Sequence, residues 1–124
     1  MFANLSNHPE TQWSEEQRRA AEAIARPILD FPFPGVDPAA SAEAVGELAR
    51  MMAATVMMAG PAAALVEGEF TLTYAVVGLL MRAGVPCYAA TSNREAIERP
   101  LDGGGIGRSS VYRFVSLRRY LEIE

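Results

Sequence analysis

Few side chains in this sequence are suited to metal or redox chemistry. Its 124 residues include one cysteine, one histidine and no lysine. The lone Cys87 excludes a disulfide framework, and its apolar neighbours indicate a packed thiol rather than a reactive one. One histidine and one cysteine are too few for a structural zinc site, and the sequence has neither a P-loop nor paired acids in a metal pattern. We therefore expect neither a metal nor another cofactor.

Long hydrophobic runs are also missing. No segment reaches the roughly 18 to 20 uninterrupted apolar residues of a membrane span, and no basic region precedes an apolar run at the amino terminus, as it would in a signal peptide. Hydrophobic residues still make up 50% of the chain, which is enough for a single folded domain over residues 1–124. We expect a soluble cytoplasmic protein with no membrane partner.

Charge is unevenly distributed along the chain, whose formal net charge is −4. Residues 1–81 contain four arginines and ten acids, a balance of −6, whereas residues 82–119 contain seven arginines and three acids, a balance of +4. Codon bias would explain the absence of lysine, but arginine also presents a planar fork that suits phosphate. An acidic chain argues against long nucleic acid as a partner and is compatible with a small phosphorylated ligand.

Strand and helix patterns alternate along most of the sequence. In residues 62–94, an apolar run leads into Glu67-Gly68-Glu69, a long apolar helix follows, and a second short strand ends in Thr91-Ser92-Asn93-Arg94. Such a βαβ unit holds its two strands parallel. Strands are expected at 2–6, 27–31, 62–66, 85–90 and 111–121, and helices at about 15–25, 38–59 and 69–83. Connection rules favour an α/β fold, a Rossmann-like three-layer sandwich whose mainly parallel sheet has the order 2-1-3-4 with the fifth strand beside the fourth.

Two features of these elements bear on assembly and on loops. The third helix has almost no polar side, and such a helix must be covered on both faces. We expect a homodimer or higher oligomer with this helix at or near the interface; the alternative is that the second helix shields it.

Residues 99–109 are expected to form a mobile glycine-rich loop, because their consecutive glycines neither follow a strand nor open a helix.

The helix starts are clear in one case and open in another. Ser14-Glu15-Glu16-Gln17 matches a capping box, in which the serine accepts from the third helical N–H group. The second helix can begin at Asp37-Pro38, with proline in its first turn, or at Ser41.

Three predicted loops leave the carboxyl ends of the inner strands, where ligands bind in parallel sheets and helix amino termini offer free N–H groups. The side chains expected at this crevice are Ser6, Asn7, His8 and Trp13 after the first strand, Glu67, Gly68, Glu69, Phe70 and Thr71 after the third, and Thr91, Ser92, Asn93 and Arg94 after the fourth.

Each of these residues also has a purely structural interpretation. Gly68 suits a tight turn, Thr71 suits a helix start, and His8 before a proline suits a hydrogen-bonded turn. Together, however, they favour an anionic nucleotide: the glycine lets a ligand approach the backbone, Arg94 can fork onto phosphate, and Trp13 or Phe70 offers a ring for a base.

Four segments carry a resemblance to a known family: NLSNHPETQWSEEQ (4–17), DFPFPGVDP (30–38), GEFTLTYAVVGLL (68–80) and ATSNR (90–94). The sequence is similar to small stand-alone CRISPR-associated proteins with a CARF-like, Rossmann-like domain, a group that includes ring nucleases and binders of cyclic oligoadenylate. The resemblance implies a homodimer that binds cyclic tetra-adenylate across its two-fold axis and ends type III CRISPR antiviral signalling.

The sequence leaves turnover open. If the ligand is cleaved, the resemblance implies metal-independent attack of a ribose 2′-hydroxyl on its own phosphate. Arg94 and the helix start would then stabilise charge, and His8 is the only imidazole available as acid or base. Otherwise the protein sequesters the ligand. The alternatives are a non-enzymatic homo-oligomeric interaction module and an enzyme acting on another small nucleotide phosphate.

Overall fold

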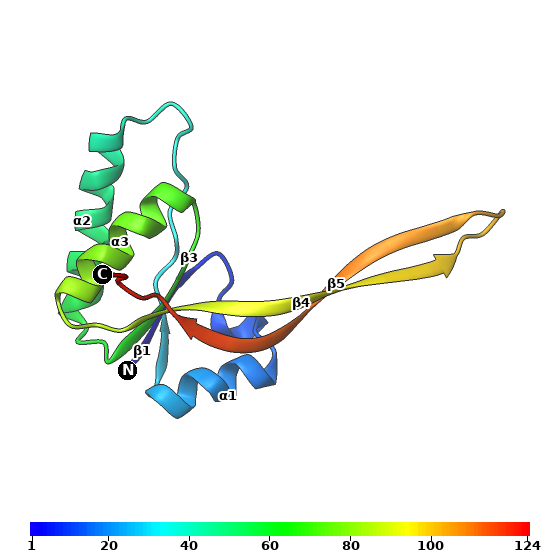
Figure 1. Cartoon of the computed structure of the whole chain (residues 1–124), viewed down its shortest axis with the longest axis horizontal. Helices are drawn as coiled ribbons and strands as arrows, with labels where there is room; N and C mark the ends of the chain where they lie inside the picture. The colour runs from blue at the N-terminus through cyan, green and yellow to red at the C-terminus, as the bar shows by residue number, and fades with distance from the viewer.

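A five-stranded mixed sheet in the order β2-β1-β3-β4-β5 forms the frame of the chain (Figure 1). The computed structural model describes residues 1–124. Its strands are β1 (Phe2–Ser6), β2 (Ile28–Asp30), β3 (Ala63–Glu67), β4 (Cys87–Pro100) and β5 (Ile106–Arg119), and its helices are α1 (Glu15–Ile24), α2 (Ala42–Met58) and α3 (Phe70–Arg82). β1 pairs in parallel with β2 and β3, β3 pairs in parallel with β4, and β5 runs antiparallel to β4. The expected strand order is therefore confirmed.

Helices cover both faces of the sheet, with α2 and α3 on one face and α1 on the other (Figure 1). Every residue of the central strand β1 is buried, and alternate side chains enter the two cores. Leu5 packs in the larger core under α2 and α3, whereas Phe2 packs with Trp13 in the smaller core beside α1. Cys87 is also fully buried, and burial raises the pKa of its thiol to about 11, as a packed thiol requires.

Serine hydroxyls cap both surface helices. The Ser14 Oγ accepts from the Gln17 N–H at 3.2 Å, which agrees with the capping-box prediction. The Ser41 Oγ accepts from the Ala44 N–H at 3.1 Å, so α2 begins after Ser41 and the Asp37-Pro38 start is wrong. Asp37 instead closes a separate turn by accepting from the Ala39 N–H at 2.9 Å.

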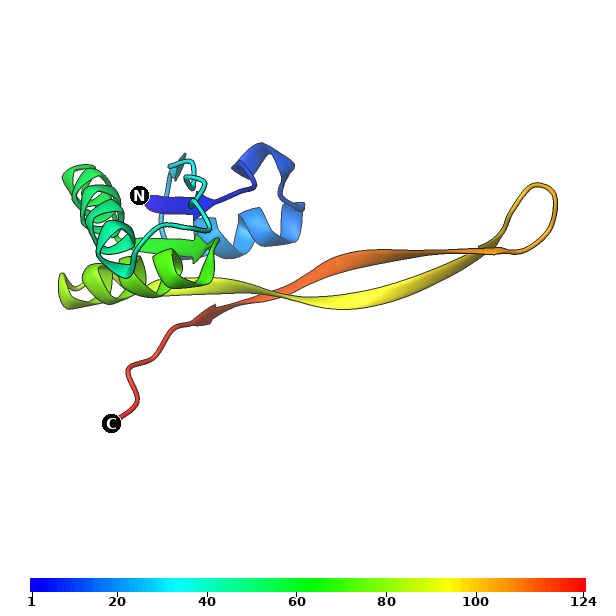
Figure 2. The same ribbon diagram turned by 90° about the horizontal axis from the view of Figure 1, so that it is seen from above.

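β4 and β5 extend far beyond the rest of the sheet as a two-stranded ribbon (Figure 2). Two predictions are corrected here. Thr91-Ser92-Asn93-Arg94 lies inside β4 rather than in a loop, and residues 99–109 contain the ends of both strands joined by a tight turn. The turn forms because Gly103, Gly104 and Gly105 all adopt positive φ, a region that glycine enters without a Cβ clash. We call residues 94–112 the arm.

α3 packs against both the sheet and α2, and its outer side stays open. Leu72, Val76 and Leu80 are fully buried, so the second helix shields only part of the face that the sheet leaves uncovered. Phe70 and Tyr74 point outward and are 89% and 84% exposed. None of the helices combines the length and the hydrophobicity that a membrane span requires.

Candidate functional site

The segments after β1 and β3 meet β4 at one edge of the sheet, as the sequence predicts. Ser6, the last residue of β1, lies in register with Glu67, the last residue of β3. β4 passes the same point at Ala90, whose N–H group donates a hydrogen bond to the Glu67 carboxylate. This carboxyl edge of the sheet is the candidate site.

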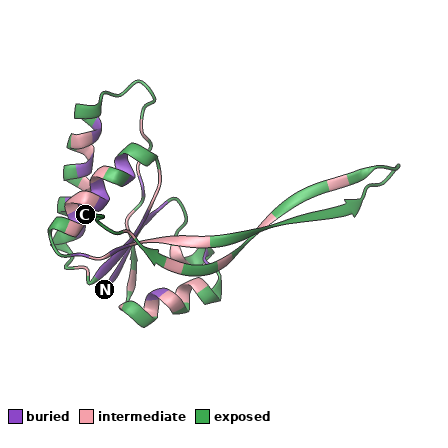
Figure 3. Ribbon diagram, in the orientation of Figure 1, coloured by how far each residue is buried: buried purple, intermediate pink, exposed green.

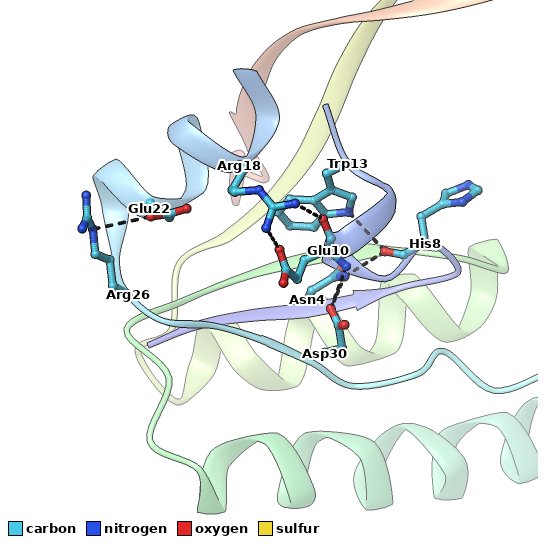
Figure 4. Close-up of polar contacts among 8 residues, drawn as sticks. All are labelled: Asn4, His8, Glu10, Trp13, Arg18, Glu22, Arg26 and Asp30. Atoms are coloured by element: carbon cyan, nitrogen blue, oxygen red, sulfur yellow. Dashed lines mark hydrogen bonds and ion pairs between the residues drawn. The ribbon is translucent and has the colours of Figure 1, made fainter. Parts of the chain in front are cut away.

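The loop after β1 is held by hydrogen bonds to one carbonyl group. The His8 carbonyl oxygen accepts from Asn4 Nδ2 at 2.9 Å and from Trp13 Nε1 at 3.1 Å (Figure 4). It also accepts from Ser6 Oγ at 3.1 Å. Asn4 Nδ2 also donates to the Asp30 carboxylate at 2.8 Å. Ser6 and Trp13 are buried, so the polar groups of both residues already have partners inside the protein.

Trp13 does not offer a free ring to a ligand. Its indole meets Phe2 edge to face, with ring centroids 6.5 Å apart and planes at 85°. The His8 imidazole, in contrast, points away from the hydrogen-bonded cluster (Figure 4) and is exposed. His8 therefore remains available to a ligand, whereas Trp13 anchors the loop.

One ion pair fastens this loop to α1. Arg18 of α1 pairs with the Glu10 carboxylate and donates to the Glu10 carbonyl oxygen at 2.9 Å (Figure 4). The second pair in this view, Arg26 with Glu22 at 3.8 Å, lies at the other end of α1 and does not hold the loop. Arg18 therefore helps to fix the path of the loop between β1 and α1.

The first N–H groups of α3 are already occupied by a carboxylate. Glu69 accepts from the Thr71 N–H at 3.0 Å and from the Leu72 N–H at 2.8 Å, and the Thr71 hydroxyl donates to it as well. These hydrogen bonds, the Thr71 hydroxyl first, lower the pKa of Glu69. A phosphate at this helix start would have to displace the Glu69 side chain.

Gly68 is required by packing. A Cβ at this position would lie 2.3 Å from Cε1 of Phe33, a buried ring that comes from the segment between β2 and α2. No real Cβ atom approaches a carbon so closely, so the ring itself excludes a side chain here. Phe33 thus occupies the space that the sequence analysis assigned to a ligand at Gly68.

Two further titratable groups lie at this edge: Glu67, which the sequence places at the crevice, and Tyr120, which it does not. Burial raises the pKa of the Glu67 carboxyl, while the Ala90 N–H and the nearby His8 oppose that shift. The Tyr120 hydroxyl donates to the Val66 carbonyl oxygen at 2.8 Å, and burial, followed by the charge of Glu67, raises its pKa. Glu67 ends an apolar run, which is a signal in the sequence; Tyr120 follows the last strand and carries none.

The predicted site residues that lie in β4 contact β5 along the ribbon. Thr91 Oγ1 lies 2.8 Å from Ser116 Oγ of β5, and Arg94 Nε donates to Ser110 Oγ at 3.0 Å. At about 3.3 Å per residue, Arg94 lies about 13 Å beyond Ala90. Ser92 and Asn93 are exposed on the way. The structure therefore brings His8, Glu67 and Phe70 toward one edge and carries Arg94 away from it.

A large groove lies beside α3 rather than between the loops. It has a volume of about 840 Å³ and runs along the outer side of α3 against the carboxyl-terminal segment. Its walls include Phe70, Tyr74 and Gly78 of the helix and Leu121 and Ile123 of that segment. No three His, Cys, Asp or Glu side chains are grouped so that they could hold a metal ion.

One comparison with known proteins gave a match. The sequence model described as the Uncharacterized protein MJ1673 family matches residues 1–118. No curated protein and no solved structure matches the chain.

Proposed function

The chain belongs to the uncharacterized MJ1673 family, and we propose from its own residues that it binds a cyclic oligoadenylate, in the first place cyclic tetra-adenylate, as a homodimer in type III CRISPR antiviral signalling. The observation that carries this proposal is the meeting of the β1 loop, the β3–α3 turn and β4 at one edge of the sheet. The strand order and the helices on both faces support a Rossmann-like, CARF-like architecture, in which this edge is the ligand side.

The side chains free to act at this edge give the proposal its chemistry. Phe70 presents an exposed ring on which an adenine base can stack. His8 is the only imidazole of the chain and is exposed at the end of β1. If turnover occurs, the ribose 2′-oxygen attacks the adjacent phosphorus, the 5′-oxygen leaves, and His8 is placed to move the proton, which yields a linear product with a 2′,3′-cyclic phosphate.

Incubation with labelled cyclic tetra-adenylate in EDTA tests the proposal. Linear products with 2′,3′-cyclic ends indicate a ring nuclease, and a tight shift of the intact ring indicates a sequestering protein. The absence of binding at micromolar protein would reject both. Phe70→Ala and His8→Ala should weaken binding or turnover, whereas Met58→Ala, at an exposed position in the last turn of α2, should leave both unchanged.

The Glu69 side chain determines whether the N–H groups at the start of α3 can bind a phosphate of the ligand. A phosphate that binds the Thr71 and Leu72 N–H groups must displace the Glu69 carboxylate. Glu69→Ser keeps a capping oxygen but removes the negative charge, so it should raise the affinity for the ligand. Unchanged or weaker binding by this variant would place the phosphates elsewhere along the edge.

A second candidate function is a non-enzymatic homo-oligomeric interaction module. The exposed Phe70 and Tyr74 on α3 and the apolar groove beside them favour it. This candidate predicts assembly without any nucleotide and assembly unaffected by His8→Ala. A thermal-shift panel of nucleotides separates it from an enzyme that acts on another small nucleotide phosphate, because only the enzyme would be stabilised by one of them.

A further inference from the structure

The arm, residues 94–112, has almost no support from its own chain. None of its residues is buried, and it lies outside both cores (Figure 3). A two-stranded ribbon without a third strand or a helix against it is marginally stable at best in water. The arm therefore needs a surface that the single chain does not provide.

Apolar side chains continue to the end of the arm. The exposed ones are Ile97, Leu101, Ile106 and Tyr112. Ile106 and Tyr112 lie six positions apart in β5, so both side chains stand on one face of the ribbon, on either side of the Arg108–Glu98 ion pair, whereas Ile97 stands on the other face. Exposed apolar side chains of this size on an unsupported ribbon are typical of a surface that another chain covers.

We infer that the arm docks in the groove beside α3 of a second copy of this chain, and that the second copy returns the same contact. The groove has a volume of about 840 Å³, and ten of its sixteen lining residues are hydrophobic. Phe70 and Tyr74, the two most exposed aromatic rings, lie in its wall. The contact covers Tyr74 on the outer side of α3 together with Ile106 and Tyr112 of the arm, and it leaves Phe70 at the helix start to the proposed ligand.

The dimensions fit such an exchange. The ten residues of β4 from 91 to 100 span about 33 Å, which is about the diameter of a small domain. With two strands about 5 Å apart and their side chains, one face of the arm offers roughly 300 Å². Two reciprocal contacts give each copy roughly 600 Å² before any further contact, close to the roughly 800 Å² per partner of a stable interface.

Charge argues against nucleic acid as the occupant. Arg108 pairs with Glu98 at 3.1 Å and Arg113 with Glu95 at 3.0 Å along the ribbon, whereas Arg94 and Arg99 form no ion pair in the chain. The groove itself is lined by Arg50, Arg82 and Glu122 beside its apolar side chains, so apolar burial rather than charge has to hold the arm there. Nucleic acid would meet a chain of net charge −4, which disfavours it as the occupant.

Sedimentation velocity of the full chain at micromolar concentration, with matched variants, tests the inference. The arm variant Ile106→Lys/Tyr112→Lys and the groove variant Tyr74→Glu should each raise the dissociation constant of the homodimer by about tenfold or more. Met58→Lys, at a 91% exposed position outside the arm and the groove, should not change it.

Mixing the two variants gives the sharpest result. The arm variant keeps an intact groove and the groove variant keeps an intact arm, so an equal mixture should recover a dimer with one of the two contacts. A monomeric wild type, an arm variant that dimerises as well as the wild type, or a mixture that stays monomeric would each overturn the inference.

A shortened chain tests the inference even if the charged arm variant fails to fold. Asn93 and Arg113 face each other in the ladder, so an Asn-Gly turn can replace residues 94–112 and close the hairpin. Both cores remain in this variant, whose circular dichroism should show a folded body. The inference requires it to be a monomer, and a shortened chain that still dimerises with unchanged affinity contradicts it.

Discussion

At Gly68 a single missing side chain allows an aromatic ring to lie on the backbone. An added Cβ would lie 2.3 Å from Phe33 Cε1, so Gly68→Ala must push the ring or the β3–α3 turn aside. Overpacking of this kind costs about 1–3 kcal/mol, and urea unfolding should show the loss. Gly78→Ala is the control, because nothing lies within 4 Å of its added Cβ and alanine is favoured over glycine inside a helix by about 0.5–1 kcal/mol.

The double variant with Phe33→Ala identifies the cause of that loss. If the ring is responsible, Gly68→Ala should cost far less in the Phe33→Ala background than in the wild type. Equal costs in the two backgrounds would mean that the backbone conformation of Gly68, and not the ring, excludes alanine.

Glu67 should make the stability of the chain depend on pH. Because burial raises the pKa of its carboxyl above the ordinary 4.5 in the folded state, the folded protein binds this proton more tightly than the unfolded chain does. The stabilisation is therefore present below pH 4.5 and is lost as the pH rises through the raised pKa. Glu67→Gln stays neutral and keeps an oxygen for the Ala90 N–H, so its melting temperature should rise relative to the wild type over that range.

Glu69→Gln should change the pH dependence of stability in the opposite direction. Hydrogen bonds lower the pKa of Glu69, so its stabilisation is present above the ordinary pKa of the carboxyl and is lost as the pH falls through the lowered one. Melting temperatures measured between about pH 3 and pH 7 should separate the two variants in opposite directions from the wild type. Parallel curves for Glu67→Gln and the wild type would show that Glu67 has no such role.

At this scale the sequence predicts where the site lies but not how its groups are used. The carboxyl ends of β1 and β3 follow from local patterns, and Ser6 and Glu67 do lie side by side there. Whether a helix start binds a ligand or its own Glu69 depends on one side-chain rotation. The partner of Gly68 is Phe33, 35 positions earlier in the chain, so no local pattern could reveal it.

At the scale of elements, the start of α2 tests which of two capping residues determines the helix. The Ser41 Oγ accepts from the Ala44 N–H, while Asp37 closes a separate turn. Ser41→Ala should therefore cost about 1 kcal/mol of unfolding free energy, the usual effect of losing a cap, and Asp37→Ala should cost less. Chemical denaturation of both variants gives the comparison, and a larger loss for Asp37→Ala would move the helix start back to residue 38.

The elements inside the body could be predicted, and the ribbon could not. Burial on one or both faces gives β1 and β3 their apolar runs and gives α3 its apolar stripe. The arm is exposed on both faces in the single chain, so Arg94 to Tyr112 has no alternation of the usual kind. Its glycines predict a loop, because a turn between two solvated strands has the same composition as a linker.

At the scale of the whole molecule, the chain combines a buried body with an arm that its own core does not support. Nearly all fully buried side chains lie in the two cores, between the sheet and the helices. Local stability follows burial, so the hydrogen bonds of the arm should open more readily than those of β1 and β3. A partner that covers the arm would make its hydrogen bonds open less readily and would so reduce this difference.

Hydrogen exchange at two protein concentrations should reveal that change. If a second copy covers the arm, raising the concentration through the dissociation constant should slow amide exchange in peptides covering residues 94–112, by mass action. Peptides covering β1 and β3 should exchange slowly at both concentrations, because these strands are buried within one chain. In the Tyr74→Glu variant the slowing should require a higher concentration. Exchange in the arm that does not vary with concentration would show that the arm stays in solvent.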